Sequence, residues 1–253
     1  MLQGITFDFW GTLAQDSGEF TSPLRLGMLA HYLPGRSLAE IEAAYDQAWK
    51  RFLGELDRGL GLSPSAMVCM TLDALQAAVP PPDLDAVTRG WEESILQHPP
   101  ALLPGALEVL AEVRRRGLWV GLISDTGVTP GRVTREFLRR HDALRLFDVL
   151  TFSNELGISK ACPQTFRQTV RAMGLEPHQV AHLGDQPQGE LRGARAAGVH
   201  PLLLLESSQR RDGIPVADVT LERLVDIIDV LDHWEEALAT GGIWRTSATN
   251  EHD

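Results

Sequence analysis

Residues 4–13 read GITFDFWGTL, an apolar stretch that reaches an aspartate, Asp8, and then enters a Gly-Thr turn. The apolar part, 4–9, is typical of a buried β-strand. A carboxylate at the carboxyl end of the first strand of a parallel sheet is well placed to act as a nucleophile. Aspartates in turns are more often structural than catalytic. The hypothesis that Asp8 is a nucleophile is therefore supported only by the segments that follow it.

After residue 104, helical and strand-like segments alternate along the chain. Helices are expected at 106–116, 132–140, 164–173, 190–197 and 220–238, and strands at 118–123, 149–151, 179–183 and 201–205. Strands separated by helices predict right-handed βαβ units and a parallel sheet covered on both faces. The predicted fold class is therefore α/β, with a Rossmann-like parallel sheet as its core.

The stretch between the first strand and this alternation is helical in character. Helices are expected around 24–33, after a Ser37–Glu40 capping box, from Ser63 as far as the prolines at 80–82, and at 84–96. A block of this kind, inserted after the first strand, would hang over the carboxyl edge of the sheet as a lid does. We predict an α/β core domain at 1–17 and 99–240, a helical-bundle cap domain at 18–98, and a polar, poorly ordered tail at 241–253.

Composition limits the possible partners and the compartment. The chain has 253 residues and a formal net charge of −11 without a compensating basic stripe, which argues against nucleic acid or an anionic membrane as a partner. Cys69 and Cys162 have neither disulfide-framework nor zinc-site spacing. No basic signal-peptide start is visible, and the apolar runs are too short to span a bilayer. We expect a soluble, cytoplasmic protein.

Polar residues stand at the ends of four predicted strands: Asp8, Ser124, Lys160 in the loop 153–160, and Asp185. Each alone has an ordinary structural explanation as a turn residue, a helix cap or a solvated charge. Because ligands of an open parallel sheet bind beyond the carboxyl ends of its strands, we expect the four to converge on one site. His182 lies inside a predicted strand and is interpreted as a core histidine rather than a base.

Over residues 4–205 these segments resemble, in order, the four motifs of the haloacid dehalogenase (HAD) superfamily, a large group of mostly magnesium-dependent phosphatases. The first motif, Asp-x-Asp-Gly-Thr-Leu in the family, is here 8–13 with Trp10 in place of the second aspartate. The second, a strand ending in Ser or Thr, matches 118–124. The third matches Lys160 ahead of a Pro-x-x-Phe helix start, and the fourth matches Gly184-Asp185 with Glu190 in place of the usual aspartate.

The resemblance implies a role for each matching residue. Asp8 would attack phosphorus and form an aspartyl-phosphate, while Ser124 and Lys160 would neutralise the phosphoryl oxygens. The carboxylates of Asp8 and Asp185 and the backbone carbonyl of Trp10 would hold Mg²⁺, with Glu190 binding it through water. The remaining implied substrate-binding residues are Thr12, Asp125 and Thr126. The resemblance further implies a small phosphorylated metabolite as substrate and a monomer or a homodimer.

Trp10 leaves three functions open. Family phosphatases use the second aspartate as a general acid and base, which is typically worth ~10²–10⁴-fold in rate, and an indole N–H cannot replace it. A catalytically weakened binding or regulatory protein is one alternative. Metal-independent 2-haloacid dehalogenases, which carry an aromatic residue at this position, are the other. They lack the acidic fourth motif, and Asp8 facing Asp185 without a cation would be repulsive, so an Mg²⁺-dependent phosphatase ranks first. Asp125 also departs from the family, which usually has Asn there.

Overall fold

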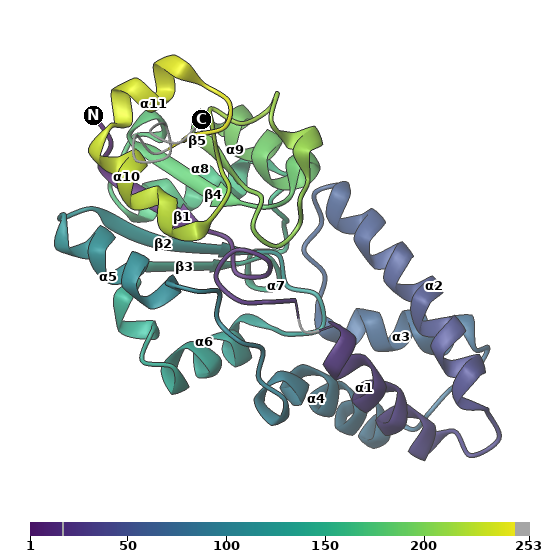
Figure 1. The fold of residues 1–253 in the computed structure, drawn as a ribbon. Coiled ribbons are helices and arrows are strands. Elements are labelled where there is room, and N and C mark those ends of the chain that lie inside the picture. Colours follow the sequence, from purple (N-terminus) through teal and green to yellow (C-terminus); the bar gives the residue numbers. More distant parts are fainter. Residues whose placement is uncertain (17, 246–253) are drawn as a thin grey trace, which may run out of the picture.

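The computed structural model describes residues 1–16 and 18–245, and these form an α/β fold around one parallel sheet (Figure 1). The sheet has six strands in the order β3-β2-β1-β4-β5-β6. Their bounds are β1 Gly4–Phe7, β2 Trp119–Ser124, β3 Val149–Phe152, β4 Val180–Gly184, β5 His200–Leu204 and β6 Val219–Leu221. Every neighbouring pair is parallel, so the predicted fold class is confirmed.

The register of the sheet brings the carboxyl ends of β1, β2 and β4 side by side. Phe7 at the end of β1 lies opposite Leu122 of β2 on one side and Leu183 of β4 on the other. The chain adds strands on one side of β1 through β3 and then on the other side from β4 onward. Asp8 and Asp185 therefore follow the two strands at the switch point of the sheet, where ligands of such folds bind.

Helices cover both faces of the sheet. On β2, Val120 and Leu122 belong to one apolar cluster and Ile123 to another, and successive residues of a strand point to opposite faces. The first face is covered by α5 Ala106–Arg115, α6 Gly131–Arg140, α10 Ile227–Asp232 and α11 Trp234–Thr240. The second face is covered by α8 Pro163–Ala172 and α9 Arg192–Ala197. Both layers bury the sheet and hold its strand ends in fixed register.

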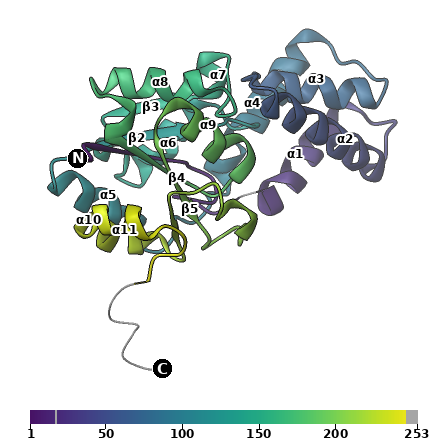
Figure 2. The same cartoon turned by 90° about the horizontal axis from the view of Figure 1, so that it is seen from above.

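Four further helices form a block with its own apolar interior beside the sheet (Figure 2). They are α1 Gly18–Tyr32, α2 Leu38–Asp57, α3 Pro64–Ala74 and α4 Pro81–Gln97. The capping box is confirmed: Ser37 Oγ accepts from Glu40 N, and the Glu40 carboxylate accepts from Ser37 N. This arrangement supports our proposal that 18–98 is a cap domain. No helix of the described residues is long and apolar enough to cross a membrane.

Two element boundaries in and near the cap differ from the prediction. The helix that begins after Ser63 ends at Ala74 and does not reach the prolines, because Gln76 adopts a left-handed conformation with φ of 50°. The prolines instead open α4, where a missing N–H costs little. Ser63 stands at the N-cap position, yet its hydroxyl pairs with that of Ser65 rather than with the backbone.

The predicted long helix at 220–238 is wrong. Val219–Leu221 is strand β6, a short 3₁₀ turn follows at Leu224–Asp226, and α10 and α11 meet at His233. The three-residue strand is recognisable only by its pairing with β5. Thr220 of β6 also pairs with the following segment, since its N–H donates to Gly242 O and its carbonyl accepts from Trp244 N. The first part of the predicted loose tail is thus attached to the sheet, and 246–253 lie outside the described residues.

The four-helix block, our proposed cap, contacts the α/β part of the chain beside the site. Gly61 N donates to Gly157 O at 3.0 Å, and Ser159 N donates to Gly59 O at 3.0 Å. Gly61 approaches the core so closely that a Cβ there would lie 2.1 Å from Ser153 O. This contact ends one residue before Lys160, so the end of α2 and the site lysine are fixed against each other.

Candidate active site

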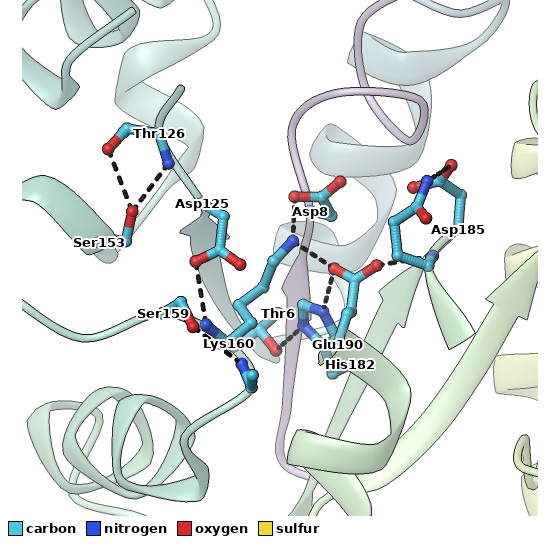
Figure 3. A network of polar contacts seen from close by, with 12 residues as sticks. Thr6, Asp8, Asp125, Thr126, Ser153, Ser159, Lys160, His182, Asp185 and Glu190 are labelled. Carbon is cyan, nitrogen blue, oxygen red and sulfur yellow. Dashed lines mark hydrogen bonds and ion pairs between the residues drawn. The ribbon is translucent and has the colours of Figure 1, made fainter. Parts of the chain in front are cut away.

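The centre of the site is a buried ion pair between the first and third motifs (Figure 3). Lys160 Nζ donates to Asp8 Oδ1 through a short contact and to Glu190 Oε1 at 2.5 Å. Asp8 and Lys160 are each 4% exposed, and Glu190 is 1% exposed. Asp8 comes from the end of β1, Lys160 from the loop before α8, and Glu190 from the π-helical turn Pro187–Leu191 after β4. The predicted convergence of these motifs is therefore present in the structure.

The carboxylate of Glu190 also forms a hydrogen bond with a buried histidine. Its Oε1 also accepts from His182 Nε2 at 2.8 Å, and His182 Nδ1 lies 2.8 Å from Thr6 Oγ1. Its Oε2 accepts from Gln186 N at 3.0 Å. His182 is fully buried, and that burial lowers its pKa although Glu190 opposes the shift. His182 is a core histidine, as expected, and it also positions Glu190, which the sequence interpretation missed.

Burial and mutual repulsion set the charges of the carboxyl groups. Burial raises the pKa of Asp8 well above its usual range and Glu190 raises it further, while Lys160 opposes both. The same two causes raise the pKa of Asp185 to about 7. Burial raises the pKa of Glu190 as well, but Lys160 and His182 outweigh it and lower that pKa to about 2. Glu190 is thus ionised at neutral pH, and an added cation would favour the ionised forms of Asp8 and Asp185.

Three carboxylates lie close enough together to hold a divalent cation. Ligand oxygens of Asp8, Asp185 and Glu190 lie within 4.8 Å of one another. Asp185 Oδ1 is buried and makes no hydrogen bond to any described residue. Gly11 leaves room for that carboxylate, since a Cβ there would lie 2.9 Å from it. Hard oxygen donors with an orphaned acceptor suit Mg²⁺, and the backbone carbonyl of Trp10 remains a candidate ligand beside them.

Two buried hydroxyl groups near the strand ends lack hydrogen-bond partners among the described residues. Ser124 Oγ and Thr12 Oγ1 are buried, and within the described part of the chain neither has a hydrogen-bond partner. Buried hydroxyls normally find partners, so a phosphoryl group accepting from both would satisfy them. Thr126, the third hydroxyl predicted to bind substrate, is turned away from Asp8 and pairs with Ser153 Oγ at 3.1 Å (Figure 3). Its role is to fix the loop.

Trp10 lies at the margin of this site. It is half-buried, and its ring packs edge-on against Phe9 with centroids 4.8 Å apart. The indole also rests against the large apolar cluster of the sheet. The ring therefore has a packing role, and the site gains no carboxyl group from this position.

Several polar contacts of the site were not predicted. Gln186 Nε2 donates to Asp185 Oδ2 at 2.8 Å. Ser207 Oγ donates to Gly11 O, and Ser208 Oγ donates to Asp185 O at 3.3 Å. The two serines follow β5, whose carboxyl end lies at the same edge, so the rule that identified Asp8 and Asp185 would also have identified them.

The residues that form this site lie within a segment that matches a known protein family. Residues 2–198 match the family model of haloacid dehalogenase-like hydrolases. The match covers most of the chain and all four motif ends, so the protein belongs to the haloacid dehalogenase-like hydrolases.

Several named proteins and solved structures are similar to this chain. Phosphoserine phosphatase of Thermus thermophilus is 42% identical over 98 residues, which are 39% of this chain and 38% of that protein. The chain spans about half, or less, of the curated relatives that it matches first. The 2-haloacid dehalogenase of Pseudomonas syringae has a similar fold, with a TM-score of 0.71, 18% identity, and coverage of 92% of this chain and 100% of that one. A magnesium-bound HAD-hydrolase of Bacillus subtilis reaches 0.69 at 14% identity, covering 91% and 99%.

Proposed function

We propose that this protein is a Mg²⁺-dependent phosphatase that hydrolyses a small phosphorylated metabolite through an aspartyl-phosphate at Asp8. We further propose, from its composition, that it acts in the cytoplasm and, from its resemblance to the family, that it is a monomer or homodimer. The named phosphatase among its relatives supports the reaction class. We do not assign the substrate of that relative to this protein, because the match covers only 38% of the relative.

One observation carries the proposal: the edge of the sheet that carries the clustered carboxylates of Asp8 and Asp185 also carries two buried hydroxyl groups without hydrogen-bond partners among the described residues. Asp8 and Asp185 need a cation, whereas Ser124 and Thr12 need an acceptor, and a magnesium-bound phosphoryl group supplies both. When bound, Mg²⁺ would neutralise charge that otherwise repels the nucleophile. Lys160 opposes the rise in the pKa of Asp8 that burial and Glu190 cause, and it offers a donor to the phosphoryl oxygens.

A metal-dependent screen tests this function. Purified protein, stripped with EDTA and then supplied with Mg²⁺ or left without it, is assayed on p-nitrophenyl phosphate and on a panel of phosphorylated metabolites. We expect phosphate release only with Mg²⁺, and none from Asp8→Asn. Binding of panel compounds without any release would favour the weakened binding protein, and metal-independent halide release from 2-chloropropionate would favour a dehalogenase.

The presence of Trp10 predicts which leaving groups the enzyme prefers. p-Nitrophenyl phosphate should be preferred over alkyl phosphates, because p-nitrophenolate departs without a proton and position 10 offers no carboxyl group to an alkoxide. Trp10→Asp should raise kcat/KM for glycerol 2-phosphate by up to ~10²-fold, the lower range for a general acid. Trp10→Asn is the matched control, since it loses the same contact with Phe9 but gains no acid. An equal change in both variants would show that the indole matters only through its bulk.

A further inference from the structure

Asp125 stands where the family usually has Asn, and the substrate-binding role that the resemblance implies does not require its acidic side chain. It follows Ser124 at the end of β2, and Figure 3 shows its carboxyl group beside the Lys160–Asp8 pair. One oxygen, Oδ1, accepts from the backbone N–H of Lys160 at 2.9 Å. The other oxygen makes no hydrogen bond or ion pair to the described residues. The side chain is partly exposed, so a substrate can reach it.

The surroundings of Asp125 keep a proton available. Burial raises its pKa to about 6, Lys160 opposes that shift, and the carboxylates of Glu190 and Asp57 add to it. Asp57 is the last residue of α2. Ser159, which precedes Lys160, donates to Leu56 O of that helix at 2.6 Å. Because Asp125 accepts from Lys160 N, it lies beside this contact between α2 and the core. In phosphoryl transfer the leaving oxygen departs roughly opposite the nucleophile. A proton for that oxygen must therefore come from a group of the site other than Asp8.

We propose that Asp125 is the general acid and base of this site, in place of the carboxyl group that Trp10 does not provide. The inference rests on the proposed phosphatase function. In the first step the Asp8 carboxylate forms a bond to phosphorus, the bond from phosphorus to the leaving oxygen breaks, and Asp125 gives its proton to that oxygen. In the second step water attacks the aspartyl-phosphate, Asp125 takes a proton from the water, and phosphate leaves Asp8.

Asp125→Asn tests this role with little change in shape, because the amide oxygen can still accept from Lys160 N. We expect kcat/KM for glycerol 2-phosphate to fall ~10²-fold, as alkoxide leaving groups need the proton. For p-nitrophenyl phosphate, kcat/KM should stay within roughly threefold, because it reports the steps up to release of p-nitrophenolate. Its kcat should fall, with a burst of p-nitrophenol, since hydrolysis of the aspartyl-phosphate loses its base.

The pH profile gives a second readout. For the alkyl substrate, kcat/KM of the wild type should fall as pH rises through the pKa of Asp125, because the acid must be protonated. Asp57→Asn removes a like charge facing Asp125, so this limb should move to lower pH while kcat/KM for p-nitrophenyl phosphate is unchanged. In Asp125→Asn the limb should disappear, and the charges of Lys160 and Glu190 stay in both variants.

Two further variants keep the proposal falsifiable. Asp125→Glu retains an acid and should keep part of the alkyl activity, and Trp10→Asp should restore it in the Asp125→Asn background. Equal losses on both substrates, or an unchanged alkyl rate in Asp125→Asn, would overturn the role of Asp125. Failure of the wild type to hydrolyse p-nitrophenyl phosphate in an Asp8-dependent way would instead refute the proposed phosphatase function.

Discussion

Asp8→Asn should abolish turnover of p-nitrophenyl phosphate, with a loss of roughly 10⁵-fold or more. An amide oxygen is a poor nucleophile, so no aspartyl-phosphate forms and no second route replaces it. The substitution also removes one of the carboxylates that would hold Mg²⁺. The measurement is kcat/KM with saturating Mg²⁺, compared with the same preparation of wild type.

The same variant should not be less stable, which separates a chemical loss from misfolding. Burial and Glu190 raise the pKa of Asp8 in the folded chain above its ordinary value. A group of this kind contributes stability below its unfolded pKa and loses that contribution as pH rises through the folded pKa. Above the folded pKa of Asp8 and without metal, its ionised carboxylate is therefore unfavourable to folding, and the neutral amide should unfold at the same or a higher urea concentration. Full turnover in this variant would remove Asp8 from the mechanism.

The positions of the main site residues could be predicted because topology alone brings strand ends together. Asp8 and Asp185 follow strands that pair directly, with Phe7 opposite Leu183. Any sequence interpretation that identifies the parallel strands correctly places these carboxylates side by side. The four helices of the cap could be predicted for a similar reason, since periodic apolar positions extend over several turns in each.

What could not be predicted depends on contacts distant in sequence. The pairing of Thr126 with Ser153, and the support of Glu190 by His182, depend on side-chain directions that no local pattern encodes. Strand β6 was missed because three residues give no periodicity, and its pairing with β5 decides its conformation. The early end of α3 reflects one left-handed residue, Gln76, whose conformation overrides an otherwise continuous helical pattern.

Lys160→Met should cause the largest loss of stability of any single substitution in the site, about 3–5 kcal/mol at pH 8 without metal. Lys160 is buried and contacts Asp8 and Glu190, so its removal leaves two buried carboxylates without a cation. The attraction of those carboxylates raises the pKa of Lys160 although burial lowers it, so the wild-type lysine is charged at this pH. Urea unfolding followed by circular dichroism measures the change.

The pH dependence of that loss identifies its cause. Without the lysine, the pKa of Asp8 rises further and the pKa of Glu190 rises from its lowered value, so the folded variant takes up protons as pH falls. The deficit relative to wild type should therefore be smaller at pH 5 than at pH 8. Because the chain contains only two lysines, Lys50→Met on the exposed side of α2 is the matched control and should change little. Adding Glu190→Gln to Lys160→Met should recover part of the lost stability, and a deficit independent of pH would mean that packing, rather than charge, makes Lys160 necessary.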